Sequence, residues 1–331
     1  MNYKDSGVDI HEQDVFNAKL CNKMPWLGGF AGAFDIGNDY LVSATDGVGT
    51  KTMLFNDFKH VKGVEIANLG IDLVAAVLND IVCTGSKPLF FNDYISLTSM
   101  DEVDAMGIVN GINTGLKLCG TNIPLIGGET ALMNDIYRHD DGFDIAGFAV
   151  GIVPKNLFID GSKIEDGDVM LGIASSGFHT NGYTLIRKVL EGHEARGALT
   201  DDLIKKIMAP SKIYVKTIGR LLQKHKDSVH AISHITGSGR ANVNRLMGES
   251  MNLRPVWHNK EPQSEIFEFI QKHGDIDDYE MRKVFNNGIG MVLMVARSDA
   301  YEIQRTLESF GEKVHEVGAI GQRVEGGYKP S

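Results

Sequence analysis

Two apolar strand patterns in the first half of the chain end in the same way, with glycine and an acidic residue. Residues 41–44 run into a turn that contains Asp46, Gly47, Gly49 and Lys51, and residues 122–126 run into a glycine pair before Glu129. Glycine lets a turn form without a Cβ penalty, so another molecule can come close to the backbone. A carboxylate and a lysine beside such a turn suit a polyphosphate with its metal ion. A polar hairpin with a surface ion pair is the simpler alternative.

A helix is predicted over residues 64–81, between these two strands. Its apolar residues recur at spacings of three and four, which gives one buried face. Polar residues form a second line along the helix, namely Asn68, Asp72 and Asn79, with Asp80 beside its end. The macrodipole disfavours a carboxylate in the last turn unless a cation compensates it, and Mg²⁺ prefers oxygen ligands from Asp and Asn. Solvated surface is the usual interpretation of such a line.

The second half of the chain contains two glycine loops, each between a strand pattern and a predicted helix. They lie at residues 175–181 and 236–239. The first N–H groups of a helix lack partners within the helix, so such a loop can hold a phosphate. The residues predicted to line the first loop are Ser175, Ser176, Gly177, His179, Thr180 and Asn181. His179 alone could be a capping residue, and Arg240 and Arg245 could be surface arginines or bidentate phosphate ligands.

Strands alternate with helices in both halves, which indicates an α/β or α+β fold with one small mixed sheet in each half. We predict two domains, residues 1–154 and 155–331.

A lone acid in a strand is usually edge-facing, and this is the expectation for Asp93. A helix is predicted around residues 12–23, and no structure is predicted after residue 323. The glycine loop at residues 28–32 is either a connector or a lid over a nucleotide.

Composition limits the possible functions. The 331 residues are 43% hydrophobic and carry a formal net charge of −10, which argues against general nucleic-acid binding. No apolar run approaches the roughly 20 residues of a membrane helix, and the N-terminus carries charge where a signal peptide has an apolar core. We therefore expect a cytoplasmic protein. Cys21, Cys83 and Cys119 are far apart, so neither a zinc site nor a disulfide framework is expected.

Ordered motifs along nearly the whole chain resemble those of the aminoimidazole ribonucleotide (AIR) synthetase family, the phosphoribosylformylglycinamidine cyclo-ligases of purine biosynthesis. In the first half these motifs are YKDSGVDI (3–10), GGFAGAFDI (28–36), SATDGVGTK (43–51), GIDLVAAVLNDI (70–81), PLFFNDYIS (88–96), LIGGETA (125–131) and DIAGF (144–148). In the second half they are DGSKIEDGDV (160–169), SSGFHTNGY (175–183), HITGSG (234–239) and FNNGIGM (285–291).

The resemblance implies an ATP-dependent ligase that works as a homodimer and uses magnesium, with two α/β domains. The first domain would bind ATP and the second the ribose phosphate of phosphoribosylformylglycinamidine. Magnesium would be held by Asp46, Asp80 and Glu129. The nucleotide would contact Asp46, Gly47, Gly49, Thr50, Lys51, Asp72, Asn79, Glu129 and Thr130.

The resemblance also implies roles in the reaction. Lys51 would be the direct cation for the phosphates, Asp80 a catalytic magnesium ligand, and His179 the proton carrier, because imidazole exchanges protons near neutral pH. The substrate would contact Ser175, Ser176, Gly177, His179, Asn181, Thr236 and Gly237.

Two segments depart from the family pattern. Residues 132–135 are Leu, Met, Asn and Asp where the family has Glu, Met, Pro and Gly, and Ser238 stands where the family's second loop has glycine. These changes leave open a catalytically inactive ATP-binding homologue. Relatives that share the fold leave open a second alternative, a small-molecule kinase or phosphotransferase.

Overall fold

The computed structural model describes residues 29–247, 252–258, 264–324 and 327–329, together with Gly7, Val15, Phe16 and Lys19. The motif at residues 3–10 apart from Gly7, together with Gly28 and Cys21, lies outside the described residues, as does most of the helix predicted at residues 12–23. Of that helix, Val15, Phe16 and Lys19 are described and are helical.

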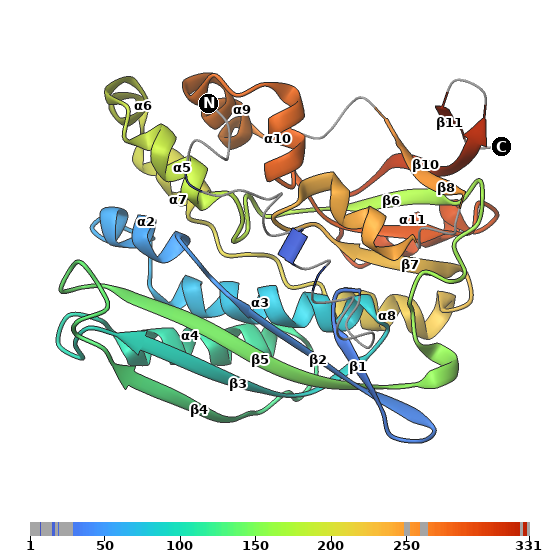
Figure 1. The fold of residues 1–331 in the computed structure, drawn as a ribbon, viewed down its shortest axis with the longest axis horizontal. Coiled ribbons are helices and arrows are strands. Elements are labelled where there is room, and N and C mark those ends of the chain that lie inside the picture. The colour runs from blue at the N-terminus through green and yellow to red at the C-terminus, as the bar shows by residue number, and fades with distance from the viewer. Residues whose placement is uncertain are drawn as a thin grey trace.

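The first half of the chain forms a sheet with two helices on one face (Figure 1). The strand order in its described part is β1-β2-β5-β3-β4. Only the β3–β4 pair is parallel among these strands, so the sheet is mixed, as predicted. The strands are β1 (Gly32–Asp35), β2 (Asp39–Gly47), β3 (Lys87–Leu97), β4 (Leu125–Leu132) and β5 (Phe143–Pro154).

Two helices, α3 (Ala67–Cys83) and α4 (Ala105–Leu118), cover the inner face of this sheet. The predicted helix at 64–81 is therefore confirmed with a later start. The helices pack closely through glycine, since a Cβ on Gly111 would lie 1.9 Å from the carbonyl oxygen of Ala67. A shorter helix, α2 (Lys51–Phe58), follows β2.

The second half of the chain forms another sheet, in which every described strand pair is antiparallel, so the prediction of a mixed sheet is wrong for this half. Its order is β11-β10-β6-β9-β7, with β8 paired to β10. The strands are β6 (Val169–Ala174), β7 (Val229–His234), β8 (Leu253–Trp257), β9 (Ile289–Val295), β10 (Val314–Val324) and β11 (Gly327–Lys329). The helices are α5 (Tyr183–Leu190), α6 (His193–Ala198), α7 (Asp201–Ile207), α8 (Val215–His225), α9 (Glu265–Gly274), α10 (Asp278–Val284) and α11 (Ala300–Ser309).

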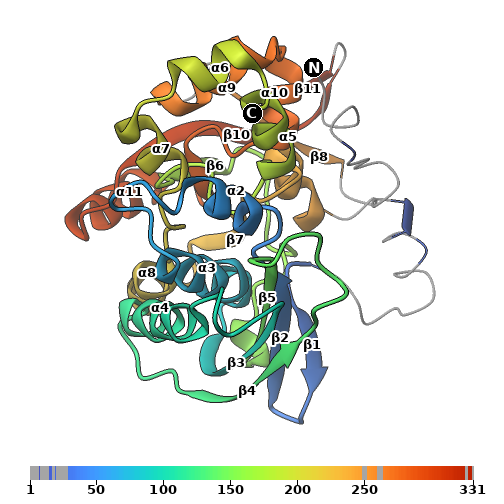
Figure 2. The same cartoon turned by 90° about the vertical axis from the view of Figure 1, so that its left-hand side faces the viewer.

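Helix α3 lies between the two sheets, and both views show the second half resting on it (Figures 1 and 2). It touches β2, β3 and β5 on one side and β7 and α8 on the other. One hydrophobic cluster accordingly contains buried residues from both halves. A helix that is apolar on most of its surface is buried on most of its sides, so the polar residues of α3 become contacts between the halves.

The helix predicted after the second glycine loop is present as the 3₁₀ helix η3 (Gly239–Leu246). Three local predictions are wrong. Strand β4 does not break at the glycine pair but continues through Gly127 and Gly128. Strand β11 lies beyond residue 323 and pairs with β10. Strand β3, which carries Asp93, is not an edge strand, because it lies between β5 and β4.

Candidate active site at the domain interface

The turn after β2 connects a strand to a helix and is not a hairpin. The N–H of Val48 donates to the carbonyl of Ile145 at 3.2 Å, and α2 begins two residues after Gly49. Gly49 has φ +66°, a left-handed conformation that favours glycine. The turn therefore leads Lys51 directly into the first turn of α2.

Lys51 is completely buried, and its ammonium group joins the two halves of the chain. Its Nζ lies 2.7 Å from Oδ2 of Asp72, whose side chain is also fully buried. It also donates to the carbonyls of His179 at 3.2 Å and Ala209 at 2.8 Å. This packing argues against the predicted role of Lys51 as a direct cation for phosphates, because its three oxygen partners already surround it.

Residues 209–214, which we call the interdomain strap, carry most of the other contacts to α3. The N–H and Oγ of Ser211 donate to Oδ1 of Asp72 at 2.8 and 2.5 Å. Asn79 is buried and bridges the strap, donating to the carbonyl of Lys212 at 3.0 Å and accepting from the N–H of Tyr214 at 2.9 Å. The predicted nucleotide contacts at Asp72 and Asn79 therefore conflict with this packing, in which both side chains hold the strap.

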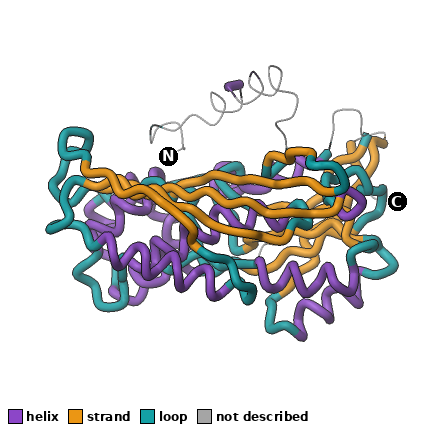
Figure 3. The backbone as a smooth tube through the Cα atoms, turned by 90° about the horizontal axis from the view of Figure 1, so that it is seen from below, coloured by secondary structure: helices purple, strands orange, loops and turns teal. Residues whose placement is uncertain are grey.

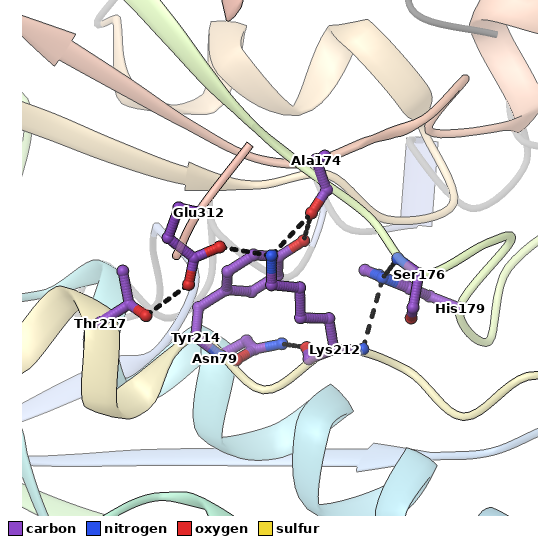
Figure 4. Close-up of polar contacts among 8 residues, drawn as sticks. All are labelled: Asn79, Ala174, Ser176, His179, Lys212, Tyr214, Thr217 and Glu312. Carbon is purple, nitrogen blue, oxygen red and sulfur yellow. Dashed lines mark hydrogen bonds and ion pairs between the residues drawn. The ribbon is translucent and has the colours of Figure 1, made fainter. Parts of the chain in front are cut away.

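The strap is fixed equally firmly to the second half (Figure 4). Lys212 forms an ion pair with Glu312 and donates to the carbonyl of Ala174 at 3.3 Å. The hydroxyl of Tyr214 donates to the same carbonyl at 2.9 Å, and Thr217 donates to Glu312 at 2.6 Å. The strap thus transmits the position of α3 to the end of β6, where the first glycine loop begins.

Burial shifts the titration of the central pair in opposite directions. It lowers the pKa of Lys51 and raises the pKa of Asp72, and the charge of each residue opposes the shift of the other. Since neither side chain reaches solvent, each needs the other to remain charged.

His179 lies in the first glycine loop with its imidazole against the strap (Figure 4). Its backbone has φ +61°, and only 2% of the residue is exposed. Nε2 accepts long hydrogen bonds from the N–H groups of Ser176 at 3.4 Å and Lys212 at 3.5 Å, while Nδ1 has no described partner. Burial lowers the pKa of His179 well below its usual range. The ring is therefore neutral at pH 7, and proton transfer by it stays a prediction.

The two glycine loops lie against each other. A Cβ on Gly237 would come within 3.1 Å of Oδ1 of Asn181. In the first loop, Oγ of Ser175 donates to the carbonyl of Gly177 at 2.9 Å, and Oγ of Ser176 donates to the strap at the carbonyl of Pro210, 2.7 Å away. In the second loop, Thr236 donates to Oδ1 of Asn242 at 3.2 Å. The structure therefore brings together the residues predicted for the substrate, although it does not test that role.

The three carboxylates predicted for magnesium are brought together only in part. Gly147 of β5 is in register with Asp46 on one side and with Asp93 on the other, and Asp93 is in register with Gly128 of β4. Residues in register share one face of a sheet, so Asp46 and Asp93 lie on the same face. Glu129 is one residue farther along β4 and points to the opposite face. Within the described ranges, no three His, Cys, Asp or Glu side chains are close enough to hold one metal ion.

Asp46 and Asp80 remain as an acidic pair beside the second half. Partial desolvation raises the pKa of Asp46, and the negative charge of Asp80 raises it further. Oδ1 of Asp80 lies 2.8 Å from Nδ1 of His234, at the end of β7, and the charges of His234 and Arg245 act on Asp46 in the opposite direction. A cation bound between the two carboxylates would relieve this repulsion, so the residues present fit magnesium.

The sequence analysis did not identify several polar residues of the site. His234 stands just before the second glycine loop, much as His179 lies in the first, and this similarity could have marked His234 as a site residue. Asp93 and Asp144 have pKa values raised by burial, but only the sheet register reveals where they lie. The strap has no motif at all.

The chain matches two family models, described as "AIR synthase related protein, N-terminal domain" over residues 28–153 and "AIR synthase related protein, C-terminal domain" over residues 165–329. It is 40% identical to the phosphoribosylformylglycinamidine cyclo-ligase of Bordetella avium, over 98% of this chain and 96% of that protein. It is 41% identical to the enzyme of the same name from Paraburkholderia phymatum, over 98% and 94% of the two chains.

Solved structures share the fold at low sequence identity. AaThiL complexed with AMPPCP and TMP has a TM-score of 0.63 at 14% identity, covering 97% of this chain and 92% of that chain. Thermotoga maritima PurL complexed with FGAR has a TM-score of 0.60 at 14% identity, covering 90% of this chain and 44% of that chain. These likenesses confirm the predicted two-sheet α/β fold.

We expect the substitution Lys51→Met to lower the free energy of unfolding by about 3–5 kcal/mol, because it leaves the buried carboxylate of Asp72 without its cation. The double variant Lys51→Met/Asp72→Leu should be more stable than Lys51→Met, since it buries no charge. Urea unfolding measures both. Lys59→Met is the control, because Lys59 forms an exposed pair with Asp141 and should lose less than about 1 kcal/mol. Equal losses for Lys51→Met and Lys59→Met would contradict this view.

We also expect stability to fall as the pH drops below about 6.5, in part through His179. In the unfolded chain its imidazole takes up a proton near pH 6.5, whereas the folded protein, with its lowered pKa, does not. Urea unfolding at several pH values from about 5 to 7 should show a slope that His179→Gln reduces by up to about 1.4 kcal/mol per pH unit. The exposed His60→Gln is the control. An unchanged slope in His179→Gln would show that folding does not lower the pKa of His179.

Proposed function

The chain belongs to the family of AIR synthase related proteins, and from this we infer that it is a phosphoribosylformylglycinamidine cyclo-ligase, an enzyme of purine biosynthesis that closes the imidazole ring with ATP. Identity of 40% extends over almost the whole of both chains. The alternative of a thiamine-phosphate kinase is not favoured, because the enzyme from Stenotrophomonas maltophilia is only 17% identical. The departures at residues 132–135 and at Ser238 do not outweigh this similarity.

The reaction requires two chemical steps. ATP phosphorylates the formyl oxygen of the substrate and leaves as ADP, and an amidine nitrogen then attacks the formyl carbon and expels phosphate. Phosphorylation converts a poor leaving group into a good one. The protein has little covalent chemistry to perform, so it acts mainly by positioning the reactants and stabilising charge.

One observation supports placing this reaction at the domain interface. Asp80, a member of the acidic pair of the first half, contacts His234, which lies two residues before Thr236. The second loop in turn touches Asn181 of the first. Groups proposed for the nucleotide and for the ribose phosphate are therefore adjacent, as transfer between the two ligands requires.

Magnesium is the proposed metal, held by Asp46 and Asp80 with water and nucleotide oxygens as further ligands. When bound, it neutralises phosphate charge. Glu129 faces the other side of the sheet, so its role in the same site stays a prediction. The loops lined by Ser175, Gly177, Asn181, Thr236 and Gly237 are proposed to hold the ribose phosphate, with residues 1–154 and 155–331 as the two domains.

We expect Asp46→Asn to lower kcat about 100-fold or more, because the acidic pair loses half of its charge toward the metal. Its thermal stability should be equal or higher, since a carboxylate that is repelled by Asp80 is removed. Formation of the aminoimidazole product from phosphoribosylformylglycinamidine, ATP and Mg²⁺ measures the activity, and Asp101→Asn is the exposed control. Absence of the product in the parent protein would overturn the function itself, whereas an active Asp46→Asn would overturn only the role of Asp46.

A homodimer is also proposed, formed through the outer face of the first sheet. Figure 3 shows these strands with no described helix over them. The face presents Phe34, Tyr94 and Phe148, which are 70%, 37% and 36% exposed, beside the half-buried Leu41, Phe90, Val150 and Ile152. Exposed apolar side chains gathered on one face are typical of an interaction surface.

We expect Phe148→Glu to convert the dimer to a monomer, because it places a charge at the centre of this face. Sedimentation equilibrium of the parent and the variant measures the change. The exposed Tyr301→Glu on α11 is the control. A parent that sediments as a monomer at every concentration would contradict the dimer.

None of the helices that the structure describes has the length and apolar character needed to cross a membrane. A cytoplasmic location is proposed from the biosynthetic role, and cell fractionation tests it.

A further inference from the structure

Burial of Lys51 leaves the proposed nucleotide site without the cation that the sequence predicts for it. Polyphosphates carry several negative charges, and proteins usually meet them with magnesium together with arginine or lysine. Gly49 and Thr50, which immediately precede Lys51, nevertheless line an open pocket of about 760 Å³. A pocket of this volume is within the usual range for small-molecule sites.

Two arginines reach this pocket from different halves of the chain. Arg138 comes from the loop between β4 and β5, and Arg187 comes from α5. Among the described residues, neither guanidinium has a carboxylate partner, and Nη1 of Arg187 contacts only Sδ of Met53 at 3.1 Å. Arginine is the side chain best suited to binding phosphate oxygens with two parallel hydrogen bonds.

None of the acidic residues that line the pocket forms an ion pair with either arginine. Asp141 is paired with Lys59 at 2.8 Å. Burial raises the pKa of Asp144, whose Oδ1 accepts from the N–H of Ile145 at 2.9 Å. Asp57 is an exposed residue of α2.

Both arginines are carried by backbone that is fixed relative to the glycine turn. The hydroxyl of Thr184 on α5 lies 3.0 Å from that of Thr50, so α5 is docked at the start of α2. The neighbour of Arg138, Tyr137, donates to Oγ of Ser96 at 2.8 Å, and Asn56 of α2 donates to the carbonyl of Asp141 at 2.8 Å. The segments that carry the two arginines are therefore both held against the part of the chain that begins at the glycine turn.

We propose that Arg138 and Arg187 are the direct cations for the phosphate chain of the nucleotide, in the pocket that begins at Gly49 and Thr50. This rests on the proposed function for the identity of the ligand. Lys51 then holds the domains together, and the two arginines take the role that the sequence predicts for it. Because one arginine comes from each half, the nucleotide would also bridge the domains.

The test is calorimetric titration of a non-hydrolysable ATP analogue with Mg²⁺ into Arg138→Gln, Arg187→Gln and the double variant. Each single variant should weaken binding by about 10- to 100-fold, the range for loss of a hydrogen bond to a charged group, and the double variant should weaken it further. Arg187→Lys should restore only part of the affinity, because lysine keeps the charge but not the fork. Arg305→Gln, on the surface of α11, is the control and should bind as the parent does.

Steady-state kinetics separates the two phosphate-bearing ligands. The KM for ATP should rise in both variants, while the KM for phosphoribosylformylglycinamidine should change by less than about threefold, which is under 1 kcal/mol. A rise confined to the KM of the ribonucleotide would overturn the proposal and assign the arginines to the ribose phosphate. Unchanged affinity for both ligands would overturn it as well.

Two further readings keep the test decisive. Thermal melting without ligand shows whether a variant is folded. If Arg187→Gln does not fold, Arg138→Gln alone tests the proposal, because Arg138 is exposed and has no described polar partner. Titration requires no turnover, so a parent that binds the analogue through the arginines but forms no aminoimidazole would refute the cyclo-ligase function and leave this proposal standing.

Discussion

The ion pair between Lys51 and Asp72 is the contact on which the arrangement of the site depends. Removing two charges from water costs several kcal/mol per ion, so such a pair is tolerated only where further hydrogen bonds satisfy it. Here the carbonyls of His179 and Ala209 and the N–H and hydroxyl of Ser211 do so. Lys51 and His179 are 128 residues apart in sequence. One buried charge pair therefore aligns the first glycine loop with the turn after β2.

Burial divides the polar residues of the interface into two groups with different tasks. Asp72, Asn79 and His179 are hidden, and their hydrogen bonds are made with the strap and the loop backbone. Asp46 and Asp80 lie where a cation can reach them. In an enzyme that relies on positioning, the first group is as necessary as the second, because a small displacement of the reacting groups slows transfer greatly. A polar residue in a matching motif is thus not necessarily a ligand-binding residue.

Sequence periodicity was sufficient to predict most of the fold, because each element buries one face and repeats accordingly. The helix at 64–81 was predicted in this way and is seen as α3. Periodicity does not reveal what covers a polar face, so the partners of Asp72 and Asn79 could not be predicted. The face of Glu129 depends on whether β4 continues through Gly127 and Gly128, since one residue reverses the side. Arg138 and Arg187 belong to no motif of the nucleotide turn.

If Arg138 and Arg187 bind the nucleotide as proposed, the two ligands are not divided strictly between the two halves of the chain. Lys51 of the first half reaches the loop of His179, and Arg187 of the second half reaches the pocket of Gly49 and Thr50. In the proposed reaction the formyl oxygen must approach the γ-phosphorus to about 3–3.5 Å, which is possible only where both ligands meet. The crossed contacts make this distance a property of the domain interface. A change in the strap should therefore affect both ligands, whereas a change in either arginine should affect one.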